Sequence, residues 1–310
     1  MNWKDKNVVV TGSSGVIGSV LVNRLVELGA RVLSIDIASG EGLGTSVEHI
    51  QVDLSKEIPR RITDFDPEIV FHLAATFERT DEEPDYWKTS FKNNTLLSHE
   101  LLSVISQCNS LKLIIFASSY LIYNPSIYLN SESIRSLKES DSISPRNLVG
   151  LGKYYTEREL DFIQKTSTQI HAVSARIFRV YGRGSRDVIS RWIRSALKGE
   201  TIEVYGRDGF FDYIYADDVA EGLVRISQAD ASQGMVNLGT GVARSVGDIV
   251  SILQSEFPGL QVRELDREST KEGSCADMTR FKQLTGWAPS TSLNEGIRQV
   301  IDFEKRRRAQ

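Results

Sequence analysis

The stretch from residue 7 to residue 18 reads Asn-Val-Val-Val-Thr-Gly-Ser-Ser-Gly-Val-Ile-Gly, and it decides the fold. Its first five residues are largely β-branched, as a buried strand requires, and three glycines follow. Behind the glycines, apolar residues recur at helical spacing, which predicts a helix over Val16–Gly29 with the last glycine as its stop. The stretch therefore predicts a strand, a glycine-rich turn and a helix in direct succession.

Glycines in such a turn each have a physical use. One permits a sharp bend, another lets backbone N–H groups approach an anion, and the last allows the helix to pack closely on the strand. The positive end of the helix then faces the anion. This arrangement predicts a cradle for the diphosphate of a dinucleotide. The residues expected to line it are Gly12, Ser14, Gly15, Val16, Ile17 and Gly18.

The first half of the chain alternates apolar runs with helical periodicity, which is typical of a parallel sheet wrapped by helices. We therefore expect an α/β fold, a Rossmann-type doubly wound parallel sheet with a smaller C-terminal lobe. The expected dinucleotide-binding domain spans 1–177, with a returning segment near 212–238, and 178–310 mainly form the substrate-binding lobe. The predicted strands are Asn7–Thr11, Arg31–Ile35, Glu48–Val52, Ile69–Leu73, Leu111–Ala117 and His171–Ile177; later helices are predicted at Asp217–Gln228, Val246–Phe257 and Leu293–Lys305.

Composition excludes several classes of protein. The 310 residues carry a formal net charge of −4, so no basic excess favours nucleic acid. No apolar run is long enough to cross a bilayer, and two cysteines make neither a disulfide framework nor a zinc site. The four histidines show no ligand spacing, so no metal is predicted. We expect a soluble, cytoplasmic protein.

Asp36 closes the second predicted strand, eighteen residues beyond Gly18. A carboxylate at this point accepts hydrogen bonds from both ribose hydroxyls of an adenosine and repels a 2′-phosphate. The cofactor predicted from these residues is NAD rather than NADP. The alternative interpretation is a simple turn followed by an aspartate that caps a helix.

The glycine spacing G-x-x-G-x-x-G resembles that of the extended short-chain dehydrogenase/reductase family, specifically its NAD-dependent nucleotide-sugar epimerases and dehydratases. The resemblance covers nearly the whole chain. Later matching segments are His72–Ala75, 118–123, 145–157, 176–182, 212–218, 237–241 and 286–289. The resemblance implies cofactor contacts from Asp53, Leu54, Leu73, Ala74, Ala75, Asn94, Ser118 and Lys153. It also implies a homodimer, formed through Asp85–Cys108 and Arg146–Lys165, where Leu96, Leu97, Leu101 and Ile105 supply apolar side chains either to the partner or to the sheet.

Oxidation of a secondary alcohol by NAD needs a base for the hydroxyl proton. Members of this family use a tyrosine four residues before a lysine, whose ammonium stabilises the phenolate, together with a serine or threonine at a strand end. By this resemblance Ser119 holds the reacting sugar hydroxyl and Lys153 the nicotinamide ribose. In this chain Val149 occupies the tyrosine position, and Gly152 occupies the position of the usual serine before the lysine.

Valine cannot exchange a proton, and three explanations follow. A neighbouring tyrosine (Tyr120, Tyr123 or Tyr154) or a substrate-bound water does the proton work, the chain is an active-site variant, or it binds NAD and ligand without turnover. Tyr120, beside Ser119, is the best placed of the three tyrosines, and it is equally consistent with an aromatic pocket wall.

The residues after Ser119 discriminate between reactions. Dehydratases of the family carry an Asp-Glu pair there, and related decarboxylases a glutamate, whereas this chain has Tyr120 and Leu121. The resemblance therefore favours a nucleotide-sugar epimerase acting at C4 through a transient keto-sugar. A 4,6-dehydratase with relocated acid–base groups comes second, and a non-catalytic protein that binds NAD and a nucleotide-diphosphate sugar third.

The substrate side of the sequence departs from the family pattern. Arg179 stands where an asparagine is usual, Arg183 where a proline is usual, and Phe211 where an arginine normally binds the nucleotide diphosphate. We expect Arg179, Arg183 or both to bind the diphosphate or a further acidic group, since a guanidinium pairs two oxygens at once. The alternative is a surface ion-pair network. Tyr213 is a weaker candidate, and the pair Asp217-Asp218 is expected to cap a helix.

Overall fold

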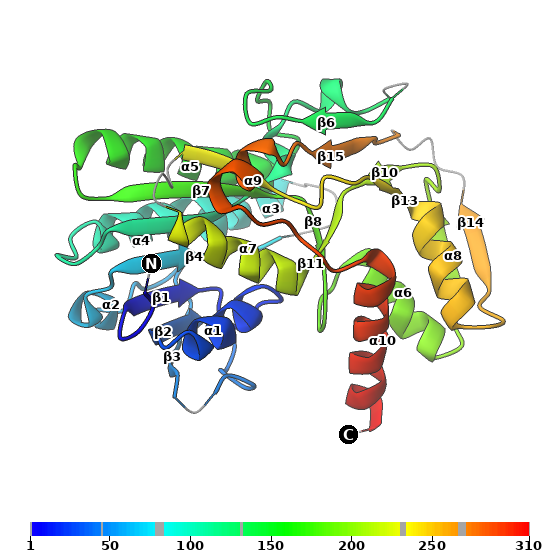
Figure 1. Ribbon diagram of the computed structural model, residues 1–310, viewed down its shortest axis with the longest axis horizontal. Coiled ribbons are helices and arrows are strands. Elements are labelled where there is room, and N and C mark those ends of the chain that lie inside the picture. Colours follow the sequence, from blue (N-terminus) through cyan, green and yellow to red (C-terminus); the bar gives the residue numbers. More distant parts are fainter. Residues whose placement is uncertain are drawn as a thin grey trace.

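The computed structural model describes residues 2–44, 46–77, 84–130, 133–229, 234–265 and 271–309. Its centre is a seven-stranded sheet in the order β12-β7-β5-β4-β1-β2-β3, and every pairing in it is parallel (Figure 1). The predicted Rossmann-type α/β fold is confirmed. The strands are β1 (Asn7–Thr11), β2 (Arg31–Asp36), β3 (Glu48–Gln51), β4 (Ile69–His72), β5 (Leu113–Ser119), β7 (His171–Ile177) and β12 (Gly234–Leu238).

The strand order positions the site. From β1 the chain adds β2 and β3 on one side, then crosses to place β4, β5, β7 and β12 on the other. The helices that follow β1 and β4 therefore leave the sheet in opposite directions. The crevice outside the carboxyl ends of β1 and β4 is the place where doubly wound sheets bind ligands.

Successive residues of β1 face opposite layers. Val8 and Val10 join the hydrophobic core that contains α1 (Gly18–Glu27) and α7 (Ala216–Gln228), whereas Val9 joins the core that contains α4 (Leu97–Ile105) and α5 (Leu148–Thr166). The second layer also holds α2 (Arg61–Phe65), α3 (Pro84–Ser90) and a π-helical turn (Phe91–Leu96). Burial of the strands on both faces explains why they were recognisable as apolar runs.

All six predicted strands exist, with ends that differ by no more than two residues. The strand β5 runs on to Ser118 and Ser119, which pair with Arg176 and Ile177 of β7, because the backbone ladder continues after the apolar side chains end. The first helix begins at Gly18 instead of Val16, since residues 12–17 form the turn.

The C-terminal part (right of the sheet in Figure 1) has its own hydrophobic core, built on α6 (Val188–Leu197), α8 (Val246–Glu256) and α10 (Leu293–Ala309). Short strand pairs complete it: β8 (Arg179–Tyr181) with β11 (Tyr213–Tyr215), β9 (Ile202–Tyr205) with β14 (Val262–Leu265), and β10 (Phe210–Phe211) with β13 (Arg244–Ser245). The remaining elements are β6 (Arg135–Leu137), which pairs with β15 (Ser274–Ala276), α9 (Thr279–Thr285), which packs on β12, and two 3₁₀ turns that follow β5 (Tyr120–Ile122 and Pro125–Ile127). Within the described ranges, no helix is both long and apolar enough to cross a membrane.

Candidate active site at the carboxyl ends of the strands

The glycine-rich turn leaves no room for a side chain at Gly12 or Gly18, and little at Gly15. Gly12 has a φ of +70°, and a Cβ on it would lie 2.7 Å from the backbone nitrogen of Ala74. A Cβ on Gly18 would lie 2.1 Å from the carbonyl oxygen of Gly12, and one on Gly15 would lie 3.1 Å from the same oxygen. The turn is thus folded onto itself and onto the end of β4, and a groove beside it is lined by Gly15, Val16 and Ser19 at the start of α1. This geometry fits the diphosphate of a dinucleotide.

The carboxylate of Asp36 lies beside this turn. Its Oδ2 accepts the backbone N–H of Ser14 at 2.9 Å, and its Oδ1 accepts that of Ala38 at 2.9 Å. No helix begins in the described residues directly after Asp36, so the side chain does not cap one. Instead it joins the end of β2 to the cradle, at the place expected for an adenosine ribose.

Asp53, expected near the adenine, organises the turn after β3. Its carboxylate accepts both the hydroxyl and the backbone N–H of Ser55, at 2.7 and 3.0 Å, and pairs with Lys56 at 3.2 Å. The bond from the Ser55 hydroxyl, with help from Lys56, holds the pKa of this carboxyl below its usual value. The neighbouring Leu54 is buried in the core.

A buried chain of hydrogen bonds fixes the segment Leu73–Ala75. The backbone N–H of Ala74 donates to Thr11 Oγ1, which lies 2.8 Å from His72 Nδ1, and His72 Nε2 lies 2.9 Å from Ser98 Oγ. Ser98 donates in turn to the carbonyl of Asn94. Since each hydroxyl donates only once, Nε2 of His72 carries the ring proton. The side chain of Asn94 accepts the backbone N–H of Thr76, so both ends of the segment are held.

Lys153 is almost fully buried on α5, and its ammonium lies 4.7 Å from the centre of the Phe116 ring. Across the described ranges Lys153 forms no ion pair with a carboxylate. Burial lowers the pKa of Lys153 to about 8. One helical turn earlier, Val149 is 4% exposed and presents only hydrocarbon. A Cβ on Gly152 would lie 3.1 Å from Asn94, so the missing serine coincides with close packing of α5 on the π-helical turn.

The two serines at the end of β5 differ in their partners. The hydroxyl of Ser118 donates to Glu157 at 2.6 Å, which leaves its backbone for any cofactor contact. Ser119 is half-exposed and accepts the backbone N–H of Leu121 at 3.2 Å, so its hydroxyl proton remains available.

Tyr123 belongs to a buried polar network beneath these serines. Its hydroxyl donates to Asn237 at 2.6 Å and accepts from Arg176 at 3.2 Å, while Arg176 binds both oxygens of Glu157. These bonds engage both the proton and the oxygen of the Tyr123 hydroxyl, so the role of Tyr123 is structural. The guanidinium of Arg158 lies over the Tyr154 ring, with its central carbon 5.6 Å from the ring centre. No separate sequence signal points to Glu157, apart from its place in the matched segment 145–157.

Tyr120 and Arg179 are brought together at the other side of Ser119. The Nε of Arg179 donates to the Tyr120 hydroxyl at 3.1 Å, and the guanidinium lies flat on Phe211, 3.7 Å from the ring centre. Glu272 is 2% exposed and binds Arg179 at 3.4 Å and Arg146 at 2.5 Å. Two cations therefore share one buried carboxylate. Neither Glu272 nor Arg146 was a sequence candidate.

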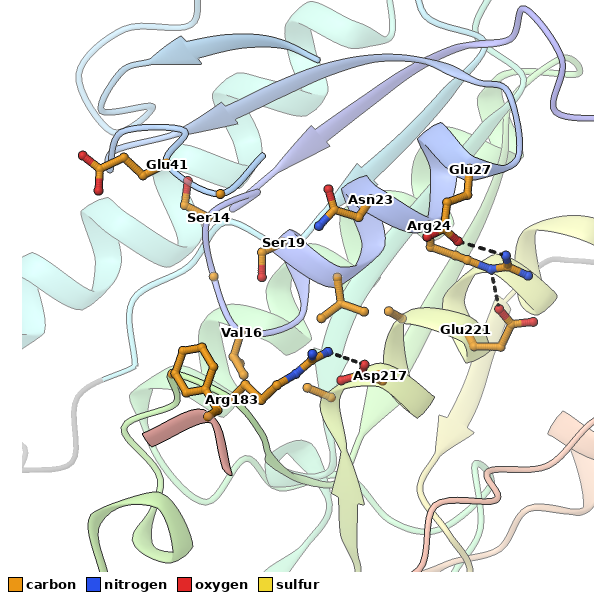
Figure 2. Close-up of a pocket in the computed structure, with 17 residues that line it drawn as sticks. Ser14, Val16, Ser19, Asn23, Arg24, Glu27, Glu41, Arg183, Asp217 and Glu221 are labelled. Carbon is orange, nitrogen blue, oxygen red and sulfur yellow. Dashed lines mark hydrogen bonds and ion pairs between the residues drawn. The ribbon is translucent and has the colours of Figure 1, made fainter. Parts of the chain in front are cut away.

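Arg183 lies elsewhere. It lines a groove of about 740 Å³ beside the cradle and pairs with Asp217 (Figure 2). The expectation that Asp217 and Asp218 cap α7 is wrong, because Tyr215 is the N-cap and no side chain caps it. Asp218 instead accepts the backbone N–H of Thr291 at 2.9 Å, because the segment just before α10 presents that N–H to it.

Tyr213 lies next to the Arg179 cluster. It pairs with Arg179 in the β8–β11 ladder, and its ring meets the edge of Phe211 at 5.8 Å. Burial raises the pKa of Tyr213 to about 12, so its hydroxyl is protonated near neutral pH. The arrangement places Tyr120, Arg179 and Tyr213 together and Arg183 apart from them.

Comparisons with known proteins agree with this geometry. Residues 8–239 match the model of a family described as the NAD dependent epimerase/dehydratase family. A putative UDP-glucose 4-epimerase of Methanocaldococcus jannaschii is 28% identical over 96% of this chain and 98% of its own. The GDP-mannose 3,5-epimerase of Arabidopsis thaliana is 27% identical over 96% of this chain and 82% of its own. The structure of MoeE5 in complex with UDP-glucose and NAD has a TM-score of 0.83 and 27% identity, covering 97% of this chain and 99% of its own.

Proposed function

Because the chain belongs to the NAD-dependent epimerase/dehydratase family, whose cofactor is NAD, we propose that it is a nucleotide-sugar epimerase acting in the cytoplasm. The proposed reaction inverts C4 of the sugar through a transient keto-sugar. By their names, the similar proteins act at different carbons: one is a putative UDP-glucose 4-epimerase and another a GDP-mannose 3,5-epimerase. A single inversion needs only one oxidisable carbon, and C4 is the carbon named for the UDP-glucose 4-epimerase relative.

The described residues fit an NAD molecule. The cradle would hold its diphosphate, Asp36 its adenosine ribose, Asp53 and Leu54 the adenine end, and Lys153 the nicotinamide ribose. When bound, NAD would accept a hydride from the sugar and return it. The segment Leu73–Ala75, fixed by the hydrogen bonds of Thr11 and Asn94, would form the floor under it.

The protein's own residues would bind and orient the sugar. Ser119 has a free hydroxyl proton to direct at the oxygen of the reacting carbon. The Lys153 ammonium is buried and has no counter-ion among the described residues, so its positive charge is weakly screened and would act strongly on a bound oxygen. The keto-sugar ring then has to rotate before it is reduced. The protein must therefore bind the nucleotide tightly and the sugar ring loosely.

The observation that carries the proposal is the pair that follows Ser119. Tyr120 and Leu121 offer no carboxylate for expelling water, so these two residues favour reversible oxidation over elimination. The test is incubation of the protein and NAD with UDP-, GDP-, CDP- and dTDP-hexoses, followed by identification of the product. We expect an epimer. A 4-keto-6-deoxy sugar would instead establish the dehydratase.

Val149 favours a second candidate, a protein that binds NAD and a nucleotide sugar without turnover. Its side chain is buried hydrocarbon one turn before Lys153. The variant Val149→Tyr separates the candidates. A wild-type protein that binds but stays inert, and that gains turnover with Val149→Tyr, would be the non-catalytic binder.

Arg179 remains the proposed ligand of the substrate diphosphate, and Arg183, which lies apart from it beside the cradle, remains the proposed ligand of a further acidic group. Arg179 is 36% exposed at its side chain and its bond to Glu272 is long at 3.4 Å, so its Nη groups can turn to an incoming diphosphate. Arg183 is 39% exposed and pairs with Asp217. Tyr213 would flank the same substrate.

We further propose a homodimer. Of the expected apolar residues, Leu97, Leu101 and Ile105 are buried in the core of the sheet. Leu96, the fourth of them, is exposed, as are other apolar side chains on the expected helices. All of these exposed side chains stand on the π-helical turn and α5, which pack together. They are Phe91 (58%), Leu96 (36%), Leu151 (54%), Tyr155 (48%) and Phe162 (65%). Exposed apolar side chains gathered in this way are typical of an interface between proteins.

A further inference from the structure

The oxidation proposed above needs a group that takes the hydroxyl proton, and Val149 cannot be that group. The candidate must reach the sugar oxygen that Ser119 holds. Tyr120 is joined to Ser119 in the chain, at the point where β5 ends and the 3₁₀ turn begins. Its environment differs from that of the other tyrosines near the site.

The Tyr120 ring is fixed. It is 5% exposed and stacks on Phe178, with ring centres 5.1 Å apart and planes within 17°. The hydroxyl accepts one hydrogen bond, from Nε of Arg179 at 3.1 Å. A cation thus directs a donor at the phenolic oxygen, which is the interaction that stabilises a phenolate.

The phenolic proton is not engaged. Among the residues that the structure describes, Tyr120 has no acceptor for it. Tyr123 is the contrast, because its hydroxyl both donates to Asn237 and accepts from Arg176. Tyr120 therefore keeps a proton to exchange, whereas Tyr123 does not.

The charges around Tyr120 sum to a net positive value. Arg179 and Arg146 share the single carboxylate of Glu272, and burial of that carboxylate strengthens both pairs. Phe211 supports the guanidinium plane of Arg179 from one side. Burial raises the pKa of Tyr120, while Arg179 and Arg146 lower it and Glu272 raises it. The resting side chain is a phenol, and its ionisation responds to each of these charges.

We propose that Tyr120 exchanges the substrate proton, with Arg179 polarising its oxygen and Glu272 and Arg146 acting as positioning residues for Arg179. The inference rests on the proposed epimerase function. Tyr120 first loses its proton to solvent. The phenolate then takes the hydroxyl proton of the sugar as the C–H electron pair leaves with its hydrogen to NAD, and the C=O bond forms. On return of the hydride to the other face, Tyr120 gives the same proton back to the oxygen.

The test is the pH profile of kcat for epimer formation by the NAD-loaded protein. Tyr120→Phe should lower kcat by about 100-fold or more, with KM changed little, because it removes proton transfer and keeps the ring. Arg179→Met should move the ascending limb of the kcat pH profile to higher pH, because it removes a positive charge that lowers the pKa of Tyr120. Glu272→Gln should move it to lower pH, since it removes a negative charge. Tyr205→Phe, at an exposed tyrosine on β9 in the C-terminal part, should match wild type.

Opposite shifts from Arg179→Met and Glu272→Gln distinguish a proton-exchanging Tyr120 from a wall aromatic, and they do not require that Tyr120→Phe folds. The double variant Tyr120→Phe/Val149→Tyr should regain turnover. Two results would overturn this inference and leave the proposed function standing. One is a kcat of Tyr120→Phe within about threefold of wild type; the other is an ascending limb of the pH profile that moves in neither Arg179→Met nor Glu272→Gln. If wild type is inert and Val149→Tyr is active, the inference also falls. If neither forms an epimer, the proposed function falls with it.

Discussion

The hydroxyl of Thr11 and the Nδ1 of His72 lie 2.8 Å apart, and both side chains are fully buried. This bond ties the end of β1 to the end of β4, the two strands between which the dinucleotide crevice opens. The same hydroxyl accepts the backbone N–H of Ala74, so the bond also holds the segment under the cofactor. His72 therefore connects the stability of the sheet with the shape of the site.

The first prediction concerns pH. Burial lowers the pKa of His72 from 6.5 to about 3, so between these values the unfolded chain binds a proton that the folded protein does not. The free energy of unfolding should rise with pH across that window, by up to about 1.4 kcal/mol per unit from this group, and stop rising above it. Urea unfolding of wild type and His72→Asn at several pH values measures the slope. His171→Asn, which replaces an exposed histidine, should keep the wild-type slope of the free energy of unfolding against pH. Equal slopes in wild type and His72→Asn would contradict the prediction.

The second prediction concerns the cradle. A Cβ on Gly18 would meet the carbonyl oxygen of Gly12 at 2.1 Å, so the turn must open to accept it. Gly18→Ala should lower the affinity for NAD by at least about tenfold and cost about 1–3 kcal/mol of stability, as overpacking does. Calorimetric titration with NAD and thermal unfolding measure the two effects. Gly44→Ala is the matched control, since its nearest neighbour lies 3.8 Å away. Unchanged NAD affinity in Gly18→Ala would mean that the turn does not hold the diphosphate.

How much of this could be read from the sequence depends on the range of the interaction. The strands of the sheet and the glycine turn were predictable, because burial on both faces and close backbone packing act on consecutive residues. The cluster at Arg179 was not, because its counter-ion, Glu272, is 93 residues away and lies in no periodic pattern. Likewise, β12 was foreseen only as a returning segment, and its pairing with β7 follows from tertiary structure.

The apolar helix faces show the same limit. Helical spacing marked Leu97, Leu101 and Ile105 as one face, but it could not tell a face on the sheet from a face on a partner. Phe91 and Phe162 belong to a different surface, which appears only when the π-helical turn and α5 are packed together.

The third prediction concerns the choice of cofactor. The carboxylate of Asp36 stands beside the cradle, where it would accept the ribose hydroxyls and repel a 2′-phosphate. Asp36→Ala should weaken NAD binding by about tenfold or more, the value of hydrogen bonds to a charged group, and should leave NADP equal or better. Fluorescence titration with both cofactors gives the ratio. Asp64→Ala, an exposed carboxylate on α2, should leave the ratio unchanged; a preserved preference for NAD in Asp36→Ala would place the discrimination elsewhere.

The last prediction concerns assembly. Phe162 is 65% exposed on α5, and Leu151 and Phe91 add further exposed apolar surface on the same layer. If this surface pairs with a second copy, Phe162→Glu buries a charge in the interface without a partner and should convert a dimer to a monomer. Size-exclusion chromatography with light scattering measures the mass, and circular dichroism checks that the variant is folded. Val242→Glu is the control, because Val242 is also exposed (48%) but lies outside this surface. A wild-type monomer, or a dimer that survives Phe162→Glu combined with Leu151→Glu, would show that the exposed face of α5 is not the interface.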